Sequence, residues 1–229
     1  TVNMSTLQFI VEYSREKNKY ENKQLEHSLV TNMTYMTEQN ADWLIDNDVL
    51  VCTSLDGPED VHNYNRSWKT GSNAYENVRK WIGYFNQRYI DKGRDPQLWH
   101  VDALMTTTRM SLTRFKEIVD LYVELGMHTI HLRPLNPYGF ALDTWKRIGY
   151  SINEYLDFYA QALNYIISLN RAGTEIVEGT ASIFLMKMLT PDDPNFVDIR
   201  SPCGAGTGQV AYNYDGQMFT CDEGRMVSA

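Results

Sequence analysis

The sequence predicts an α/β fold in which parallel strands alternate with helices. Three observations support this prediction. The chain has 229 residues, 43% of them apolar, which is enough to bury a sizeable core. Short apolar, β-rich runs alternate with segments of helical periodicity. The apolar runs end in polar loops, and this alternation requires parallel pairing of the strands through right-handed crossovers.

Four strands and the helices between them follow from this reading. The strands are expected at 25–32, 49–55, 99–106 and 128–135. Helices are expected at 5–18, 37–47, from 59 onward, at about 73–92 and at 111–126. Thr37 and Ser111 are the predicted N-caps, and Gly126 is the predicted C-terminal stop of the last of these helices.

The second half of the chain has a different character. Two helices are expected at 148–173 and 174–189, and a Pro-Asp-Asp-Pro break follows at 191–194. The tyrosine-rich helix at 148–173 fits either a packed core or the wall of a substrate groove. We expect part of a barrel over 1–147, a helical linker region over 148–200 and the start of another domain over 201–229. Because the first residue is not Met and the last residues show no helix stop, we expect a fragment of a longer protein.

Composition excludes several classes of protein. The formal net charge of -8 disfavours a broad nucleic-acid surface. The sequence contains no run of eighteen apolar residues, so no membrane-spanning helix is expected, and the first residues lack the order of a signal peptide. Three cysteines are too few for a disulfide framework, which favours a reducing cytoplasm with the cysteines as free thiols or metal ligands.

Ligands of parallel α/β folds bind at the carboxyl ends of the strands. The predicted ends are all polar: Thr31-Asn32, Ser54 to Pro58, Thr106 to Arg109 and Arg133 to Pro137. At the second end, Ser54 is placed to hydrogen-bond a carboxylate, and Arg66 is placed to clamp it bidentately. The alternative is that Asp56 caps a helix and Arg66 lies on the surface.

Other chemically versatile residues have simpler interpretations. His62, His128 and His131 have no second ligand at metal-binding spacing, so structural roles are expected for them. Cys52 lies in an apolar strand and is expected to act as a small buried hydrophobe. A hydrolase or aldolase barrel would need an acid–base pair at the strand ends, and Asp56 and Arg133 do not supply one.

Two of the three cysteines lie in one predicted hairpin. Cys203 is followed by twelve residues, then Gly216, then four residues and Cys221. Asp215-Gly216 is a strong two-residue turn signal between the two predicted strands. Iron–sulfur clusters typically need about four cysteine ligands, so either the hairpin is structural or further ligands lie beyond the sequence.

The cysteine spacing and the motifs of this hairpin, CGAG…DG…CDE, resemble the opening of the SPASM domain of radical S-adenosylmethionine (radical SAM) enzymes. TNMTYM, CTSLDGPEDVHNYNR and IHLRPLNPYG resemble the third, fourth and sixth strand ends of their partial (β/α) barrel. The sequence of these segments is similar to that of maturases of His-Xaa-Ser peptide systems. The resemblance implies that Ser54 and Arg66, twelve residues apart, hold the carboxylate of S-adenosylmethionine. It also implies that Asn32 is near the cofactor and that Leu135 packs on its adenosyl group.

The resemblance also implies roles in the hairpin and partners for the whole protein. Cys203 and Cys221 would bind an auxiliary 4Fe–4S cluster, and Asp222 would take a proton from the substrate. The parent protein would be an oxidoreductase that generates a 5′-deoxyadenosyl radical to modify a peptide or protein. Its partners would be that substrate and a reductant such as flavodoxin or ferredoxin, with no nucleic acid and no membrane.

Two departures from the family pattern concern what the chain lacks. The CxxxCxxC loop of the radical-generating cluster and the GGEP strand end are absent, and both would precede residue 1. We therefore expect this chain by itself to be inactive. The alternative from another class is a non-catalytic peptide-binding or scaffolding module with a vestigial cofactor pocket.

Overall fold

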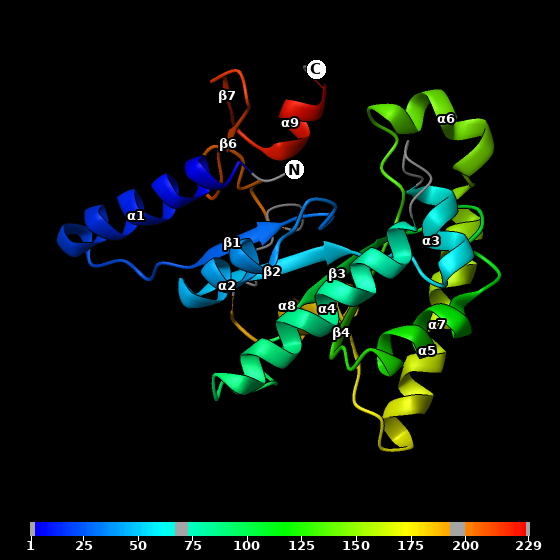
Figure 1. Ribbon diagram of the computed structural model, residues 1–229. Helices are drawn as coiled ribbons and strands as arrows, with labels where there is room; N and C mark the ends of the chain where they lie inside the picture. Colours follow the sequence, from blue (N-terminus) through cyan, green and yellow to red (C-terminus); the bar gives the residue numbers. More distant parts are fainter. Residues whose placement is uncertain (1–2, 67–72, 193–199, 228–229) are drawn as a thin grey trace.

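The computed structural model describes residues 3–66, 73–192 and 200–227 (Figure 1). Its centre is a five-stranded parallel sheet with the strand order β1-β2-β3-β4-β5. The strands are β1 (His27–Val30), β2 (Val49–Ser54), β3 (Asp102–Thr106), β4 (Thr129–Arg133) and β5 (Val177–Glu178). The four predicted strands are confirmed. The fifth lies in a range predicted to be helical, and it extends the sheet into the second half of the chain.

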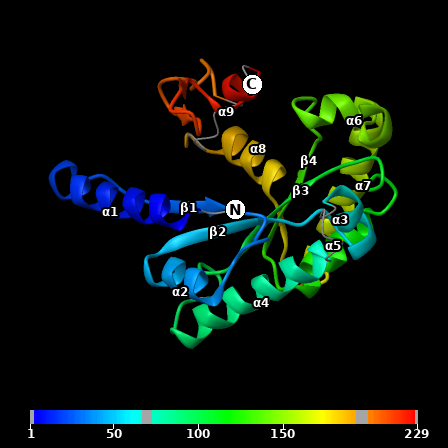
Figure 2. The same ribbon diagram turned by 45° about the horizontal axis from the view of Figure 1, so that its top comes forward.

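Helices account for most of the remaining described residues, and Figures 1 and 2 show how they surround the sheet. Their bounds are α1 (Met4–Glu21), α2 (Glu38–Asp46), α3 (Glu59–Asn65), α4 (Ala74–Asp91), α5 (Phe115–Glu124), α6 (Phe140–Ile148), α7 (Ile152–Arg171), α8 (Gly179–Leu189) and α9 (Asp222–Val227). None of these helices, in the part of the chain that the structure describes, is long and apolar enough to cross a membrane.

The two faces of the sheet differ in what covers them. On β2, Val49, Val51 and Thr53 are buried, and the alternate residues are only half-buried. On β4, Ile130 and Leu132 are fully buried in the core that the helices form. Because successive side chains of a strand point to opposite faces, His131 and Arg133 lie on the other, more open face. In the partial barrel that the sequence predicts, this open face would be the interior.

Local sequence explains several helix ends. The Thr37 hydroxyl caps α2 by accepting a hydrogen bond from the Asn40 backbone N–H at 3.2 Å, as predicted. Gly126 follows α5 with a φ of +70°, which also agrees with the prediction. Ser111 is not an N-cap, because α5 begins at Phe115. The Ser111 hydroxyl instead accepts the Thr108 N–H at 3.2 Å within a turn.

The predicted hairpin near the C-terminus forms, with a longer turn than expected. Antiparallel strands β6 (Ala211–Tyr212) and β7 (Met218–Phe219) pair in register. The Asn213 N–H donates to the Gln217 carbonyl at 2.8 Å, and Gly216 has a φ of +84°. A glycine in the left-handed region after a turn is typical of longer hairpin connections, so the predicted two-residue turn is wrong.

Candidate functional site

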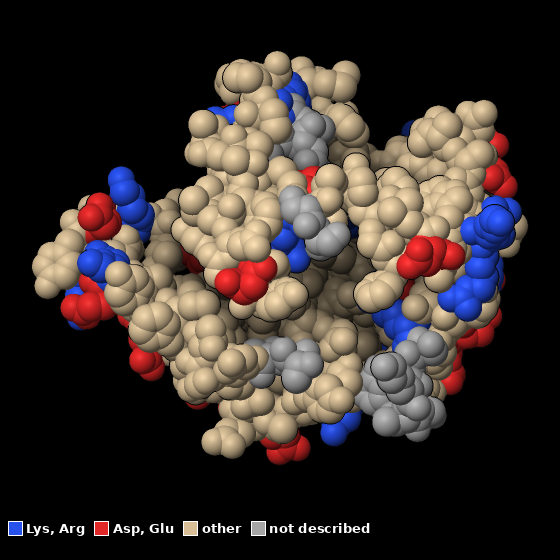
Figure 3. All heavy atoms as spheres, turned by 90° about the horizontal axis from the view of Figure 1, so that it is seen from above, with Lys and Arg blue, Asp and Glu red and all other residues tan. Residues whose placement is uncertain are grey.

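Two neighbouring cavities lie where β3 and β4 end. The larger, about 710 Å³ and here called the α8 cavity, is lined by Leu104, Thr106, His131, Arg133, Pro134, Leu135, Asn136, Tyr138, Thr180, Ile183, Phe184, Glu223 and Met226. The smaller, about 310 Å³ and here called the α3 cavity, is lined by Asp56, Tyr64, Asn65, Arg66, Thr106, Thr108, Leu135, Phe140, Ala141, Thr144, Arg147 and Ile148. Thr106 and Leu135 belong to both, so the cavities share a wall. Seen from the side of α6 and α9, the surface is hollowed at its centre (Figure 3).

Arg66 is held in the wall of the α3 cavity by Asp56. The Asp56 carboxylate is buried, with 1% of its side chain exposed, and accepts Arg66 Nε at 2.8 Å and Nη2 at 3.0 Å. It also accepts the Thr106 backbone N–H at 3.0 Å and Asn65 Nδ2 at 3.2 Å. Asp56 therefore does not cap α3; it fixes Arg66 to the end of β3. Among the described residues, Arg66 Nη1 has no hydrogen-bond partner.

Leu135 and Ser54 are placed at the same edge of the sheet. Leu135 lines both cavities, and its backbone N–H donates to the Tyr150 hydroxyl at 2.6 Å, which fixes the backbone after β4. Ser54 is the last residue of β2 and pairs with Leu104 of β3. Within the described residues, the Ser54 hydroxyl makes no hydrogen bond. It remains available as a donor two residues before Asp56.

Asn32 belongs to a different hollow. It lines a cavity of about 490 Å³ between α1 and β1, together with Leu7, Ile10 and Val30. Its side-chain oxygen accepts the Thr34 N–H at 3.1 Å, which is a local turn. The structure therefore brings Arg66 and Leu135 to one place but leaves Asn32 outside both the α3 and the α8 cavities.

The floor of the α8 cavity contains a tightly packed histidine. His131 lies against Gly179, where any added Cβ would come within 2.0 Å of the His131 ring. Burial lowers the pKa of His131, so the ring is neutral near pH 7. Next to Gly179, the buried Glu178 accepts the Tyr159 hydroxyl at 2.5 Å and the Leu132 backbone N–H at 3.2 Å. Sequence reasoning missed Glu178 because it resembled an ordinary polar residue inside a predicted helix.

His62 and Cys52 have structural surroundings. Burial lowers the pKa of His62 to about 4, and its Nδ1 accepts the Asp56 backbone N–H at 3.3 Å. Burial, with a smaller contribution from Asp102, raises the pKa of Cys52 to about 11, which keeps it a protonated thiol.

The hairpin brings the segments around Cys203 and Cys221 together. The Gly206 N–H donates to the Thr220 carbonyl at 2.8 Å. Cys203 is exposed, and the Cys221 sulfur accepts the Gly224 N–H at 3.2 Å. Within residues 3–66, 73–192 and 200–227, no group of three or more His, Cys, Asp or Glu side chains is placed to hold a metal ion. Two cysteines therefore lie on adjacent segments without a complete ligand set among the described residues.

Asp222 and Glu223 start α9 but differ in their surroundings. The Asp222 carboxylate is exposed and paired with Arg225 at 2.7 Å, and it does not line the α8 cavity. Glu223 does line that cavity, together with Met226. The acidic side chain that faces the cavity is thus the neighbour of the residue singled out from the sequence.

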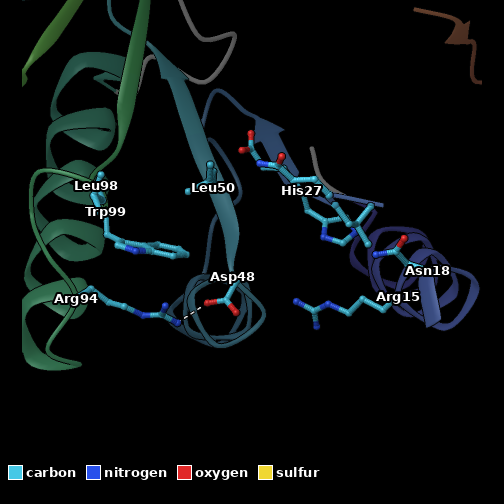
Figure 4. Close-up of a pocket in the computed structure, with 11 residues that line it drawn as sticks. Arg15, Asn18, His27, Asp48, Leu50, Arg94, Leu98 and Trp99 are labelled. Carbon is cyan, nitrogen blue, oxygen red and sulfur yellow. Dashed lines mark hydrogen bonds and ion pairs between the residues drawn. The ribbon is translucent and has the colours of Figure 1, made fainter. Parts of the chain in front are cut away.

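A further pocket, of about 630 Å³, lies at the opposite, amino-terminal ends of the strands (Figure 4). Figure 4 shows Arg15 and His27 on one side of it and Arg94 and Trp99 on the other. Both of its arginines already have partners. Arg94 pairs with Asp48 and lies 4.2 Å from the centre of the Trp99 ring, and Arg15 donates to the Asn47 side-chain oxygen at 3.0 Å. Because ligands of parallel α/β folds bind at the other ends of the strands, the candidate site is the pair of cavities near Leu135.

The chain is similar to known proteins over most of its length. No family model matches the chain. A cysteine-type anaerobic sulfatase-maturating enzyme of Clostridium perfringens is 24% identical over 220 residues, which cover 91% of this chain and 53% of the relative. The chain thus spans about half the length of the curated relatives it matches.

Solved structures of anSMEcpe are similar to nearly the whole of this chain. The structure of native anSMEcpe with bound AdoMet has a TM-score of 0.74 and 22% identity, and the match covers 96% of this chain and 56% of that one. The structure of native anSMEcpe with bound AdoMet and the Kp18Cys peptide has a TM-score of 0.72 and 20% identity, covering 96% and 57%. The chain therefore has the predicted fold, a partial barrel of the radical SAM type, and is similar over nine tenths of its length to the sulfatase-maturating radical SAM enzymes.

Proposed function

We propose that this chain is part of a radical SAM maturase that modifies a peptide or protein substrate. The observation that carries the proposal is the placement of Arg66 beside Leu135 at the carboxyl edge of the sheet. Chains of this fold have been solved with AdoMet bound. Similarity to sulfatase-maturating enzymes, and to a structure with a bound peptide, supports a peptide substrate.

The residues at this edge fit the carboxylate end of S-adenosylmethionine. Asp56 occupies Nε and Nη2 of Arg66, which leaves Nη1 to donate to the cofactor carboxylate. The free Ser54 hydroxyl is a second donor for the same group. The fit differs from the bidentate clamp that the sequence suggested, because one edge of the guanidinium is already used. In return, Arg66 is held in one orientation before the cofactor binds.

The other residues orient the cofactor and exclude water from it. When bound and reduced, S-adenosylmethionine supplies the radical that takes a hydrogen atom from the substrate. Leu135 offers an apolar surface to the adenosyl group, and Tyr150 fixes the backbone of Leu135. Asn32 lines a separate hollow, so we leave it out of the proposed cofactor site.

The ligands of the iron–sulfur clusters are absent or incomplete in this sequence. The sequence contains no CxxxCxxC, so this chain does not supply the ligands of a radical-generating cluster. Cys203 and Cys221 are suited to be two ligands of an auxiliary 4Fe–4S cluster, and the Gly224 N–H that binds the Cys221 sulfur would stabilise its thiolate. Four ligands are needed, so we assign no reaction step to this cluster. The electron would come from a reductant such as flavodoxin or ferredoxin.

Binding of S-adenosylmethionine to the intact parent protein tests the cofactor site. Arg66→Gln is expected to weaken binding about tenfold to a hundredfold, because it removes a charge-assisted hydrogen bond. Arg171→Gln, at the exposed end of α7, is the matched control and should leave the affinity unchanged. Isothermal titration calorimetry measures both. Unaltered affinity in Arg66→Gln would remove Arg66 from the site.

Asp222 is the proposed proton acceptor from the substrate. Because its carboxylate is paired with Arg225, the substrate must compete with that ion pair. Asp222→Asn in the parent should lower turnover and leave the affinity for S-adenosylmethionine unchanged. Equal turnover in Asp222→Asn would exclude this role and leave the cofactor site standing.

A further inference from the structure

One arginine of the α8 cavity has no hydrogen-bond or ion-pair partner among the described residues. Arg133 ends β4 on the open face of the sheet, directed away from the buried Ile130 and Leu132. Within the described residues, its guanidinium makes no hydrogen bond and no ion pair. Arg66, by contrast, is neutralised by Asp56 across the shared wall at Leu135. The α3 cavity therefore holds a guanidinium group that is paired with a carboxylate, and the α8 cavity holds one that is not.

The surroundings of Arg133 favour binding of an anion. Much of the cavity wall is apolar, with Leu104, Ile183, Phe184 and Met226 among the lining residues. Charge–charge attraction is stronger next to low-dielectric walls than in water. Burial lowers the pKa of His131, so Arg133 is the positive charge among the residues that line this cavity. Arg133 itself is exposed at the cavity. Its guanidinium, without an ion pair among the described residues, is suited to bidentate recognition of a planar carboxylate.

One acidic residue of the chain reaches the same cavity. Glu223 lines the wall formed by α9, and it forms no ion pair with Arg133. Arg133 and Glu223 thus line the same cavity, of about 710 Å³, without contacting each other. That volume accommodates one or more side chains of a bound peptide.

We propose that Arg133 forms a subsite for a carboxylate of the substrate peptide, either an aspartate or glutamate side chain or the peptide's C-terminus. This inference rests on the proposed function, because it assumes that a peptide enters the α8 cavity. It assigns one carboxylate to each cavity: the cofactor's to Arg66 and the substrate's to Arg133. Leu135 and Thr106 separate the two.

Selection from a library of random linear peptides tests the subsite. The parent protein is used as wild type, as Arg133→Glu and as Arg171→Glu, a control with the same charge change on an exposed arginine at the far end of α7 (Figure 1). Wild type and the control are expected to enrich Asp, Glu or a free C-terminus at one peptide position. Arg133→Glu is expected to enrich Lys or Arg at that position.

Affinities measured by fluorescence anisotropy decide the result. Replacing the selected carboxylate by an amide should weaken binding to wild type about tenfold, and should have little effect on Arg133→Gln. Equal affinity of both peptides for wild type would overturn the subsite. So would a loss of S-adenosylmethionine affinity in Arg133→Gln as large as that in Arg66→Gln, because Arg133 would then serve the cofactor.

The same experiments separate this inference from the proposed function. A parent protein that binds S-adenosylmethionine but shows no preference for carboxylates refutes the subsite alone. A protein that prefers acidic peptides through Arg133 but binds no S-adenosylmethionine refutes the proposed enzyme and leaves the subsite standing.

Discussion

Substitution of Asp56 by alanine should destabilise the fold more than any change to an exposed ion pair. The Asp56 carboxylate is 1% exposed and accepts hydrogen bonds from Arg66, Asn65 and the Thr106 backbone. It joins the end of β2 to α3 and to the end of β3. Its removal leaves the Thr106 N–H without an acceptor and Arg66 without its counter-charge.

The magnitude follows from these contacts. Breaking one side of a buried ion pair costs about 3–5 kcal/mol. The Arg66 side chain is 31% exposed and regains part of its hydration, so about 2–4 kcal/mol is expected here. For a chain of this size, each kcal/mol lowers the melting temperature by about 2–4 °C. Asp56→Ala should therefore lower it by roughly 5–15 °C.

Thermal and urea denaturation followed by circular dichroism measure this loss. The matched control is Asp46→Ala, which breaks an ion pair to Lys92 in which the aspartate side chain is 54% exposed. Exposed pairs contribute about 1 kcal/mol or less. Equal losses in Asp56→Ala and Asp46→Ala would refute the reasoning that burial makes Asp56 a structural hub.

Three further outcomes are expected. Burial lowers the pKa of His62 in the folded state to about 4, below the value of about 6.5 in the unfolded state. The contribution of His62 to the free energy of unfolding is therefore full above pH 6.5 and falls by about 2–3 kcal/mol toward pH 4. His62→Asn should flatten this pH dependence, as measured by urea titrations. Gly179→Ala should cost about 2 kcal/mol because its Cβ meets His131, and His131→Ala in the same chain should restore most of the loss. Reconstituted without air, the 229-residue chain should show no iron–sulfur absorbance, and stable cluster binding by this chain would contradict that expectation. In the parent protein, Cys203→Ser or Cys221→Ser should lower the bound iron by about four atoms.

Much of the fold was readable because its signals are local. Alternating runs long enough to show their period predicted β1 to β4, and Thr37 and Gly126 predicted helix ends from their side-chain chemistry. β5 was missed because two residues, Val177–Glu178, are too short to show any period. Ser111 misled because its hydroxyl serves a turn that competes with helix initiation.

The candidate site was predictable only in part. The sequence placed Ser54, Arg66 and Leu135 at strand ends, and the structure brings Arg66 and Leu135 to one cavity. It did not indicate that Asp56 occupies half of the Arg66 guanidinium, nor that Asn32 lines a separate hollow. Both depend on how the loops after neighbouring strands fold over the sheet.

The sequence by itself determined the order of β1 to β4 and of the helices between them, their parallel pairing, and the edge at which ligands are expected. Hydrophobic periodicity and capping chemistry act between residues close in the chain, so they can be read directly. Only the tertiary structure decided which charges are neutralised and which are free. The Asp56 carboxylate is buried when the backbone of Thr106, fifty residues away, comes within hydrogen-bond reach. Arg133 forms no ion pair with the described residues, although Glu223 lines the same cavity.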